Sequence, residues 1–196
     1  MDDVVDGRRL RRERNVSAVI DAVLDMFAEE SLTPTIERAA ERSGLSLRSV
    51  YRYFPDSDAL MQATLDEQWR RGQALAHLSR IGEGPFEERV AAFAGMRVRL
   101  YEHVGPAFRA GRVRAPRSVR LRDHIEQTRR ALTEQFERQF RTELDALPTK
   151  IRVERFAIAD VMTQLDAVDL LRRARRLTVD ESIAVVAEAI RVALTP

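Results

Sequence analysis

Two arginines and two tyrosines within six residues form the part of the sequence best suited to recognising another molecule. Arg48 and Arg52 stand four residues apart, and Tyr51 and Tyr53 flank the second of them. A guanidinium is a planar, permanently charged fork that bonds guanine or phosphate through two hydrogen bonds. A tyrosine hydroxyl bonds phosphate oxygens at the edge of a DNA groove. Because residues 46–54 contain no aspartate or glutamate, this chemistry indicates contact with DNA.

A helix through this segment separates an apolar side from a polar side. At about 100° per residue, Val50 and Phe54 fall on one side with Leu47 beside them. The two arginines fall opposite, Ser49 lies near them, and one tyrosine lies at each edge. An ordinary solvated helix face is the alternative interpretation. Residues 35–54 hold four arginines against two glutamates, a balance of +2 that suits DNA, but charge alone still favours that alternative.

The residues that precede this segment favour DNA binding. Apolar residues at three- and four-residue steps predict a short helix that ends at Gly44. Thr33 followed by Pro34 predicts the N-cap and the first residue of that helix. Ser46 predicts the N-cap of the next helix. Two short helices joined by a glycine-containing turn are typical of a helix-turn-helix.

The rest of the chain is also expected to be helical, with almost no strand signal. Its apolar residues repeat at three- and four-residue steps, both before residue 30 and after residue 55. Thr178 and Glu181 have the spacing of a capping box, which predicts the start of the last helix. An apolar stripe from Val16 to Phe27 predicts the first helix. The later long helices are expected at residues 56–78, 86–103, 116–148, 151–176 and from 179 onward, with Gly105-Pro106 ending the second of these.

Composition limits the class of protein. The chain has 196 residues, of which 44% are hydrophobic and 33% charged, enough for one or two ordinary domains. The absence of cysteine excludes disulfides, thiolate zinc sites and cysteine nucleophiles. No apolar run approaches the roughly 18 residues of a membrane span, and no targeting segment is recognised. These features predict a soluble cytoplasmic protein that has no membrane partner.

Residues 12–70 resemble the DNA-binding domain of the tetracycline-repressor (TetR) family of bacterial transcriptional regulators. The family pattern is a Thr before a short helix with Ile-Ala, then Ala-Gly-Val-Ser, then a small residue, an apolar residue, Tyr, any residue, His or Tyr, and Phe. Here "TIERAAERSGLSLRSVYRYF" follows it, with Ala39-Ala40 in place of Ile-Ala. Residues 170–190 resemble the C-terminal part of some members more weakly. The family usually has a lysine where this chain has Ser57.

The resemblance implies which residues contact DNA. By position in the family pattern they are Thr35, Ser46, Leu47, Arg48, Ser49, Tyr51, Arg52, Tyr53 and Ser57. Ser57 in place of lysine predicts weaker non-specific affinity, although a helix N-terminus still offers amides to phosphate. An arginine-rich N-terminal arm is expected either to follow a DNA groove or only to solubilise the chain; its arginines are Arg8, Arg9, Arg11, Arg12 and Arg14.

The resemblance also implies the domain organisation. We expect an all-α chain with a flexible basic arm at residues 1–11 and a three-helix DNA-binding domain at 12–70. The helix-turn-helix is expected at about residues 33–54. A larger helical domain at residues 71–196 is expected to bind an effector and to dimerise. The implied function is that of a dimeric repressor that a small molecule releases from an inverted-repeat operator. Neither enzymatic activity nor a cofactor is expected.

Two further sets of residues are predicted in the larger domain. The last two helices carry more apolar residues than one thin bundle needs, which independently predicts a homodimer through a four-helix bundle. The alternative is a monomeric core. The predicted dimer residues are Phe156, Val161, Leu165, Val168, Ile183, Val186 and Ile190. The predicted effector-pocket residues, each of which is otherwise explained as plain core, are Trp69, Phe93, Met96, Tyr101, His103, Phe108 and Met162.

Other classes of protein remain as alternatives. A di-iron bundle enzyme lacks its ligands, because no Glu-x-x-His occurs and the three histidines lack two-ligand helical spacing. No phosphate-binding glycine loop and no hydrolase motif occurs. A DNA-binding regulator that responds to no ligand is consistent with the same motif. A helical adaptor that binds only protein would leave the arginines and tyrosines of residues 48–53 unexplained.

Overall fold

The computed structural model describes residues 2–29 and 33–195, and over these residues the fold is all-α, as the sequence predicts. No strand occurs in the described residues, and none of their helices is long and apolar enough to cross a membrane. The chain forms two compact units. Unit 1 consists of Met1–Arg71 and Pro106–Ile125, and unit 2 consists of Gly72–Gly105 and Glu126–Pro196.

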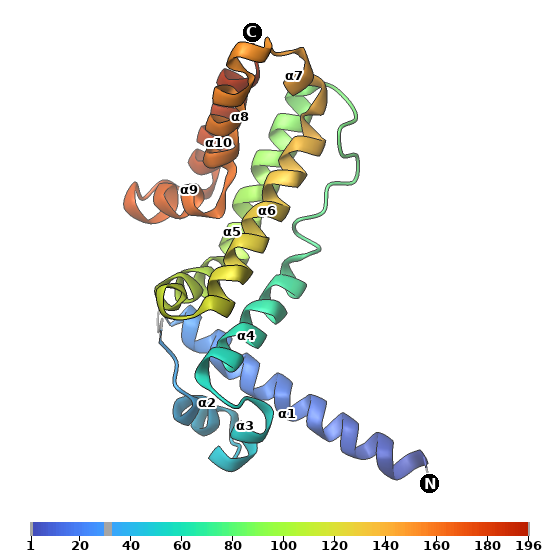
Figure 1. The fold of residues 1–196 in the computed structure, drawn as a ribbon, viewed down its shortest axis with the longest axis vertical. Helices are drawn as coiled ribbons and strands as arrows, with labels where there is room; N and C mark the ends of the chain where they lie inside the picture. The colour runs from blue at the N-terminus through green and yellow to red at the C-terminus, as the bar shows by residue number, and fades with distance from the viewer. Residues whose placement is uncertain (1, 30–32, 196) are drawn as a thin grey trace. The chain divides into compact units, whose positions relative to one another are not determined.

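Unit 1 contains the predicted helix-turn-helix. Its helices form because each has one apolar side, and these sides meet in a shared core that includes Val19, Val23 and Phe27 of the first helix. Figure 1 shows the second and third helices lying beside the first. The N-terminal helices of this unit are α1 (Asp2–Ala28), α2 (Ile36–Ser43), α3 (Leu47–Tyr53) and α4 (Ser57–Gly72).

The first eleven residues differ from the sequence expectation. A flexible arm was predicted at residues 1–11, whereas α1 begins at Asp2 and continues without a break to Ala28. The arginine-rich segment consists largely of good helix formers. Arg9 and Glu13 also form an ion pair one turn apart, with Nε and Oε1 separated by 3.7 Å. The arginines of this segment therefore extend from a helix.

The turn between α2 and α3 is fixed by its caps. Ser46 accepts a hydrogen bond from the Ser49 amide at 3.3 Å, which confirms it as the N-cap of α3. The N-cap of α2 is Thr35, which accepts from the Arg38 amide, so the prediction of Thr33 was wrong. Gly44 has φ +69°, a left-handed conformation that glycine adopts without strain.

The domain boundary also differs from the sequence expectation. The chain first passes from unit 1 to unit 2 between residues 71 and 72, one residue after the predicted boundary. Residues 106–125 then belong to unit 1 again. Gly111 lies against Leu65 of α4, and a Cβ at position 111 would come within 3.0 Å of the leucine side chain. This close approach between residues 46 positions apart in the chain leaves no local signal in the sequence.

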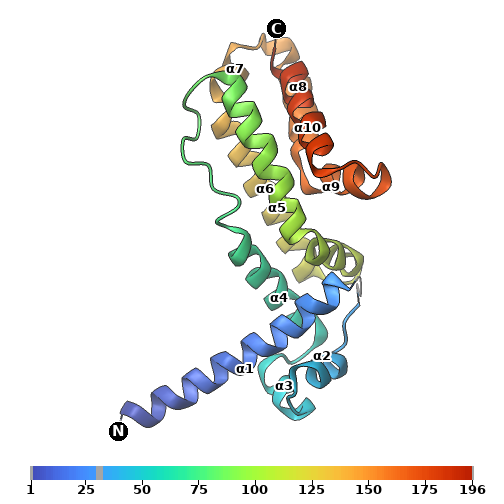
Figure 2. The same cartoon turned by 180° about the vertical axis from the view of Figure 1, so that it is seen from behind.

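Unit 2 contains a cluster of aromatic rings in edge-to-face contact. Phe93 meets Phe136 and Phe140 edge-on, with ring centroids 5.6 and 5.3 Å apart. The last helix packs along the helix that begins at Thr149, as the view from behind shows (Figure 2). Two long helices contribute to both units, α5 (Phe86–Arg114) and α6 (Val119–Gln139). The remaining elements are η1 (Ala115–Arg117), α7 (Arg141–Ala146), α8 (Thr149–Thr163), α9 (Leu165–Asp169), the π-turn η2 (Leu170–Ala174) and α10 (Val179–Leu194).

Several predicted helix ends were wrong. The helix expected to stop before Gly105-Pro106 continues through Pro106 to Arg114, because burial of Ala107 and Phe108 outweighs the lost backbone hydrogen bond. The predicted helix over 151–176 is interrupted at Gln164, whose backbone is extended. The helix expected over 116–148 ends at Gln139 and is followed by α7. The predicted fourth helix ends at Gly72 rather than at residue 78.

The predicted start of the last helix is confirmed. Thr178 accepts a hydrogen bond from the Glu181 amide, and the Glu181 carboxylate accepts one from the Thr178 amide. This reciprocal pair is the capping box that the spacing of the two residues predicts.

An ion-pair network joins α4 to α1 and gives unit 1 a pH-dependent stability. Hydrogen bonds from Arg70, opposed by partial burial and aided by Arg71, lower the pKa of Glu67 to about 2. Arg71 also donates to Asp21 of α1 at 2.6 Å. Since the pKa of Glu67 is below its ordinary value of 4.5, its stabilisation is complete above that value and is lost as the pH falls toward 2.

Glu67→Gln is therefore expected to lower the free energy of unfolding by about 1 kcal/mol at neutral pH, since partial exposure screens the ion pair. The difference from the parent should shrink as the pH falls below about 4.5. Urea unfolding at a series of pH values measures it. Glu154→Gln is the matched control, because Glu154 is exposed and has no ion-pair partner among the described residues. If both variants lost the same free energy of unfolding at every pH, the stabilising role of the Glu67 ion pair would be contradicted.

Candidate nucleic-acid interface

The third helix is held by one narrow apolar side. Val50 is fully buried and Phe54 is 5% exposed, so both belong to the core of unit 1. Leu47, the third residue of the predicted apolar side, is 41% exposed. The helix is therefore anchored by Val50 and Phe54, while its first turn stands clear of the core.

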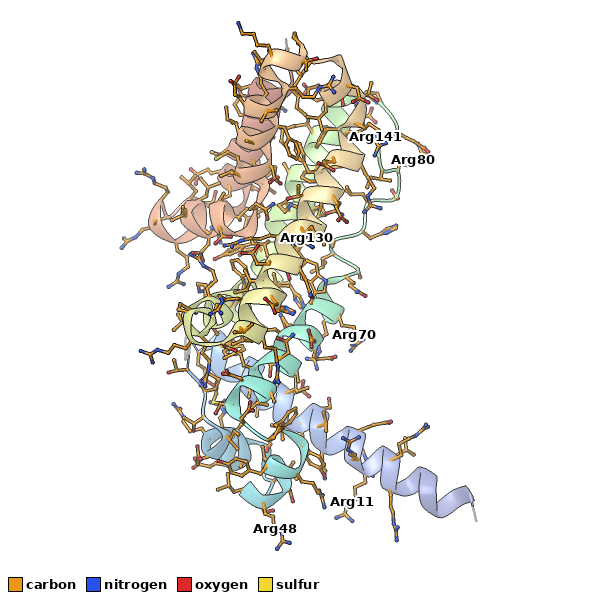
Figure 3. All side chains as sticks on the ribbon, in the orientation of Figure 1. Arg11, Arg48, Arg70, Arg80, Arg130 and Arg141 are labelled. Carbon is orange, nitrogen blue, oxygen red and sulfur yellow. The ribbon has the colours of Figure 1, made fainter. Side chains whose placement is uncertain are left out.

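The opposite side of α3 is exposed and basic. Arg48 is exposed and has no hydrogen bond or ion pair within the described part of the chain. In Figure 3 its side chain points away from the ribbon of α3. Arg52 is exposed, and Tyr51 is 44% exposed. Arg48 thus has all five of its N–H donors available for bases or phosphates.

Tyr53 is held in place from two helices. Its hydroxyl oxygen accepts hydrogen bonds from Asn15 Nδ2 of α1 at 3.1 Å and from Arg52 Nη2 at 3.0 Å. These bonds, and the nearby charges of Arg52 and Arg12, lower the pKa of the Tyr53 phenol. The Arg52 guanidinium also lies 5.1 Å from the centre of the Tyr53 ring. The hydroxyl hydrogen of Tyr53 therefore remains for an external acceptor, at a position that α1 fixes.

Tyr51 and Arg42 of α2 both form hydrogen bonds with glutamate side chains. Tyr51 donates to Glu37 of α2 across 3.5 Å, which is a weak hydrogen bond. Arg42 donates to both carboxylate oxygens of Glu29 at 2.6 and 2.7 Å, which lowers the pKa of Glu29 and raises that of Arg42. Arg42 is thereby partly neutralised, whereas Arg48 is not.

The predicted hydroxyl contacts have local roles. Thr35 and Ser46 accept hydrogen bonds from backbone amides as helix caps, and Ser46 shares a 2.9 Å hydrogen bond with Ser49. Ser57 is half-buried at the first position of α4. Asp56 accepts from the Ala59 amide at 2.6 Å, so this helix start presents a carboxylate. A carboxylate here lowers the attraction for phosphate that the helix N-terminus would otherwise provide.

The arginines of α1 lie on the same unit as α3. Arg8, Arg11, Arg12 and Arg14 are exposed, and Figure 3 shows Arg11 extending from the α1 ribbon. The charge of Arg12 acts on the Tyr53 phenol, so this part of α1 lies near the end of α3. The sequence placed these arginines in an arm and gave no sign that Asn15 contacts Tyr53. Asn15 stands between the arginine-rich run and the apolar stripe of α1, and no local pattern marks it as a contact of Tyr53.

The predicted effector-pocket residues belong to both units. Phe93, Met96 and Tyr101 are buried in unit 2, where Tyr101 donates to Asp169 at 2.5 Å. Phe108 and Trp69 belong to unit 1. His103 is half-buried in unit 2. Met162 lines an open groove of about 570 Å³ in unit 2, together with Thr133, Asp160 and Gln164.

The predicted dimer residues divide into two groups. Leu165, Val168, Val186 and Ile190 are buried within the single chain. Val161 is 61% exposed, and Phe156 and Ile183 are half-buried. Sequence periodicity finds apolar residues but does not tell those that face the chain's own core from those that face outward. It therefore missed the exposed residues Val153 and Ile158 of α8 and Val192 of α10.

The fold is shared with bacterial regulators of known structure. A transcriptional regulator from Rhodococcus sp. Rha1 superposes with a TM-score of 0.66 and 19% identity, over 93% of this chain and 95% of that one. A candidate fatty acid metabolism regulator of Clostridium perfringens superposes with a TM-score of 0.61 and 12% identity, over 91% and 99%. No protein-family model and no curated protein sequence matches the chain. At these identities the likeness establishes the fold.

Proposed function

We propose that this chain is a sequence-specific DNA-binding transcriptional regulator of the TetR type. The observation that carries the proposal is the exposed side of α3, where Arg48 has no partner among the described residues. Because only Val50 and Phe54 anchor α3 in the core, the rest of its surface is free to enter a major groove. The shared fold with a transcriptional regulator over nearly the whole chain supports the same function.

The contacts differ in what they contribute. Arg48 reads base edges, because an unpaired guanidinium can bond guanine bidentately without giving up another bond. Tyr53 positions the helix on the phosphate backbone, because its hydroxyl is joined to Arg52 and, through Asn15, to α1. The arginines of α1 contribute sequence-independent attraction that depends on salt.

The regulator is proposed to act as a homodimer. Val153, Ile158 and Val161 of α8 are between 55% and 74% exposed, and α10 packs beside α8. Arg155 Nη1 donates to the carbonyl oxygens of Val192 and Thr195, which holds the end of α10 against this helix. An apolar surface on two adjacent helices suits a two-fold four-helix bundle. A small-molecule effector bound by unit 2 is proposed to release the dimer, as a repressor, from DNA.

The operator is expected to be an inverted repeat, because a two-fold dimer presents two identical α3 helices. The half-site centres should lie about one helical turn, or somewhat more, apart. Selection of genomic fragments bound by the full-length protein, followed by footprinting, measures both. A single asymmetric half-site as the minimal tight-binding unit would contradict the dimer. If the protein showed no salt-sensitive binding to DNA, the alternative of a helical adaptor that binds only protein would be favoured instead.

Val161→Glu provides the matched variant for this experiment. The residue is 61% exposed, so the substitution leaves the core of the chain intact. A charge on the proposed dimer surface should yield monomers in light scattering and remove the preference for a full repeat over a half-site. Glu154→Gln, on the same helix, should do neither. Unchanged dimerisation of Val161→Glu would place the interface elsewhere.

A further inference from the structure

Arg97 of α5 is a buried cation in the interior of unit 2. Its side chain has no exposed surface, and its guanidinium carbon lies 4.6 Å from the centre of the Phe93 ring. Nη1 donates to Gln135 Oε1 at 3.2 Å and Nη2 donates to the Leu132 carbonyl oxygen at 3.1 Å. Nε has no hydrogen-bond partner. Both acceptors are neutral, so no bonded group balances the charge.

The acidic side chain whose charge acts on Arg97 is bonded to other residues. Asp160 of α8 acts on Arg97 through its charge but forms no ion pair with it. Its Oδ1 atom instead accepts hydrogen bonds from Thr133 Oγ1 and Gln164 Nε2, each at 2.9 Å. Burial lowers the pKa of Arg97 to about 9, with Asp160 opposing that effect, so the guanidinium is still charged at neutral pH.

A buried, charged and incompletely bonded guanidinium is costly to fold. Taking an ion out of water is unfavourable in a protein unless an opposite charge compensates it. Arg89, the other buried arginine of α5, shows the usual solution, because it is paired bidentately with Glu143. The two residues thus differ in one respect: Arg89 has its own carboxylate and Arg97 does not.

Gln135 connects Arg97 to the segment that follows α4. While its Oε1 accepts from Arg97, its Nε2 donates to the Ala76 carbonyl oxygen at 2.6 Å. Residues 73–75 are exposed, so few side-chain contacts hold this segment besides that bond. An anion that takes the place of Gln135 on Arg97 would also disturb the bond to Ala76. Ala76 is four residues beyond the end of α4.

We propose that Arg97 recognises the negative charge of the effector, and that the effector is a carboxylate with an apolar body. This inference rests on the proposed function in that it assigns the chemical class of the ligand that unit 2 binds. A carboxylate supplies two acceptors that match the guanidinium fork, including the Nε donor that has no partner. The apolar body is required because Arg97 lies against Phe93, whose ring in turn contacts Phe136 and Phe140.

The test uses the full-length protein without DNA and two pairs of probes. These are decanoate with decanamide, and 4-phenylbutanoate with 4-phenylbutanamide, all below micellar concentration. Calorimetry and the thermal unfolding midpoint measure binding. We expect each carboxylate to bind at least roughly 10-fold more tightly than its neutral amide, because a hydrogen-bonded charge pair in a buried site is worth more than about 1.4 kcal/mol.

Variants at position 97 separate recognition from a structural role. Arg97→Met should abolish the preference for carboxylate over amide and leave the unfolding midpoint of the free protein unchanged or higher, since it removes an uncompensated charge. Arg97→Lys retains a charge and should keep part of the preference. Arg99→Met is the matched control, because Arg99 is exposed on the same helix, and it should behave like the parent.

Each remaining outcome overturns the proposal. Equal binding of carboxylate and amide, an unchanged preference in Arg97→Met, or no binding of either carboxylate would exclude Arg97 as the charge-recognising residue. A lower midpoint in Arg97→Met with an unchanged preference would make Arg97 a structural residue. Operator binding is measured separately on the same preparations. Its absence would refute the proposed DNA-binding function without changing the result for carboxylates.

Discussion

Replacing Arg48 by alanine is expected to weaken operator binding by about 1–3 kcal/mol and to relax the preference at particular base pairs. The side chain is exposed and makes no bond within the described chain, so its removal should leave the fold unchanged. The loss corresponds to roughly 5- to 150-fold in affinity. Competition between the operator and random DNA, at several salt concentrations, measures the change in specificity directly.

Two other variants serve as comparisons for Arg48→Ala. Tyr53→Phe removes the hydroxyl that joins Asn15 and Arg52, so it should weaken binding to all sequences alike. Arg38→Ala removes an exposed charge from α2, the helix of a helix-turn-helix that crosses the DNA backbone. It should also weaken binding uniformly and reduce the dependence on salt.

Arg52 is intermediate between a residue that reads bases and residues that contribute affinity for any sequence. Its guanidinium is bonded to Tyr53 and stacked near the same ring, so reading a base would require it to exchange these contacts. We therefore expect Arg52→Ala to lower affinity and to relax specificity less than Arg48→Ala does. Equal losses on operator and random DNA for both arginines would refute base reading by α3.

Several features that depend on neighbouring residues were predicted correctly, although the cap predicted at Thr33 was not. The cap at Ser46 and the capping box at Thr178 and Glu181 depend on residues three positions apart, so the sequence alone specifies them. The apolar side formed by Val50 and Phe54 depends on the helical repeat, which is equally local. These features were sufficient to identify the exposed basic side of α3.

The features that the sequence did not reveal depend on contacts between distant residues. The bond from Asn15 to Tyr53 joins positions 38 residues apart. The helix continues through Pro106 because the residues after it are buried, which no local pattern indicates. The isolation of Arg97 is likewise invisible in the sequence, where it resembles the other arginines of α5. Only the positions of Gln135, Leu132 and Asp160 show that it lacks a bonded carboxylate.

An effector that releases the regulator is expected to bind operator-bound protein more weakly than free protein. Coupling between two sites is reciprocal, so the factor by which effector weakens DNA binding equals the factor by which DNA weakens effector binding. That factor is commonly 5- to 150-fold, or roughly 1–3 kcal/mol. A ligand with equal affinity for both states shifts nothing, however tightly it binds.

The covalent connections between the two units make such coupling physically reasonable. The chain passes between unit 1 and unit 2 at residues 71/72, 105/106 and 125/126, and the last two crossings lie within the continuous helices α5 and α6. The first crossing immediately precedes the segment that Gln135 holds through Ala76. A ligand that changes this bond therefore acts on the chain four residues after α4, the helix that follows the reading helix.

Trp69 of α4 allows the coupling to be measured without a label, because it is the only tryptophan and is half-buried near this crossing. Titrations of decanoate and 4-phenylbutanoate, with and without saturating operator, should give dissociation constants that differ by the factor by which each compound weakens operator binding. Random DNA at the same concentration is the control and should cause a smaller difference. If every compound that binds tightly does so equally in both titrations, none is an inducer, and the protein binds DNA independently of a ligand.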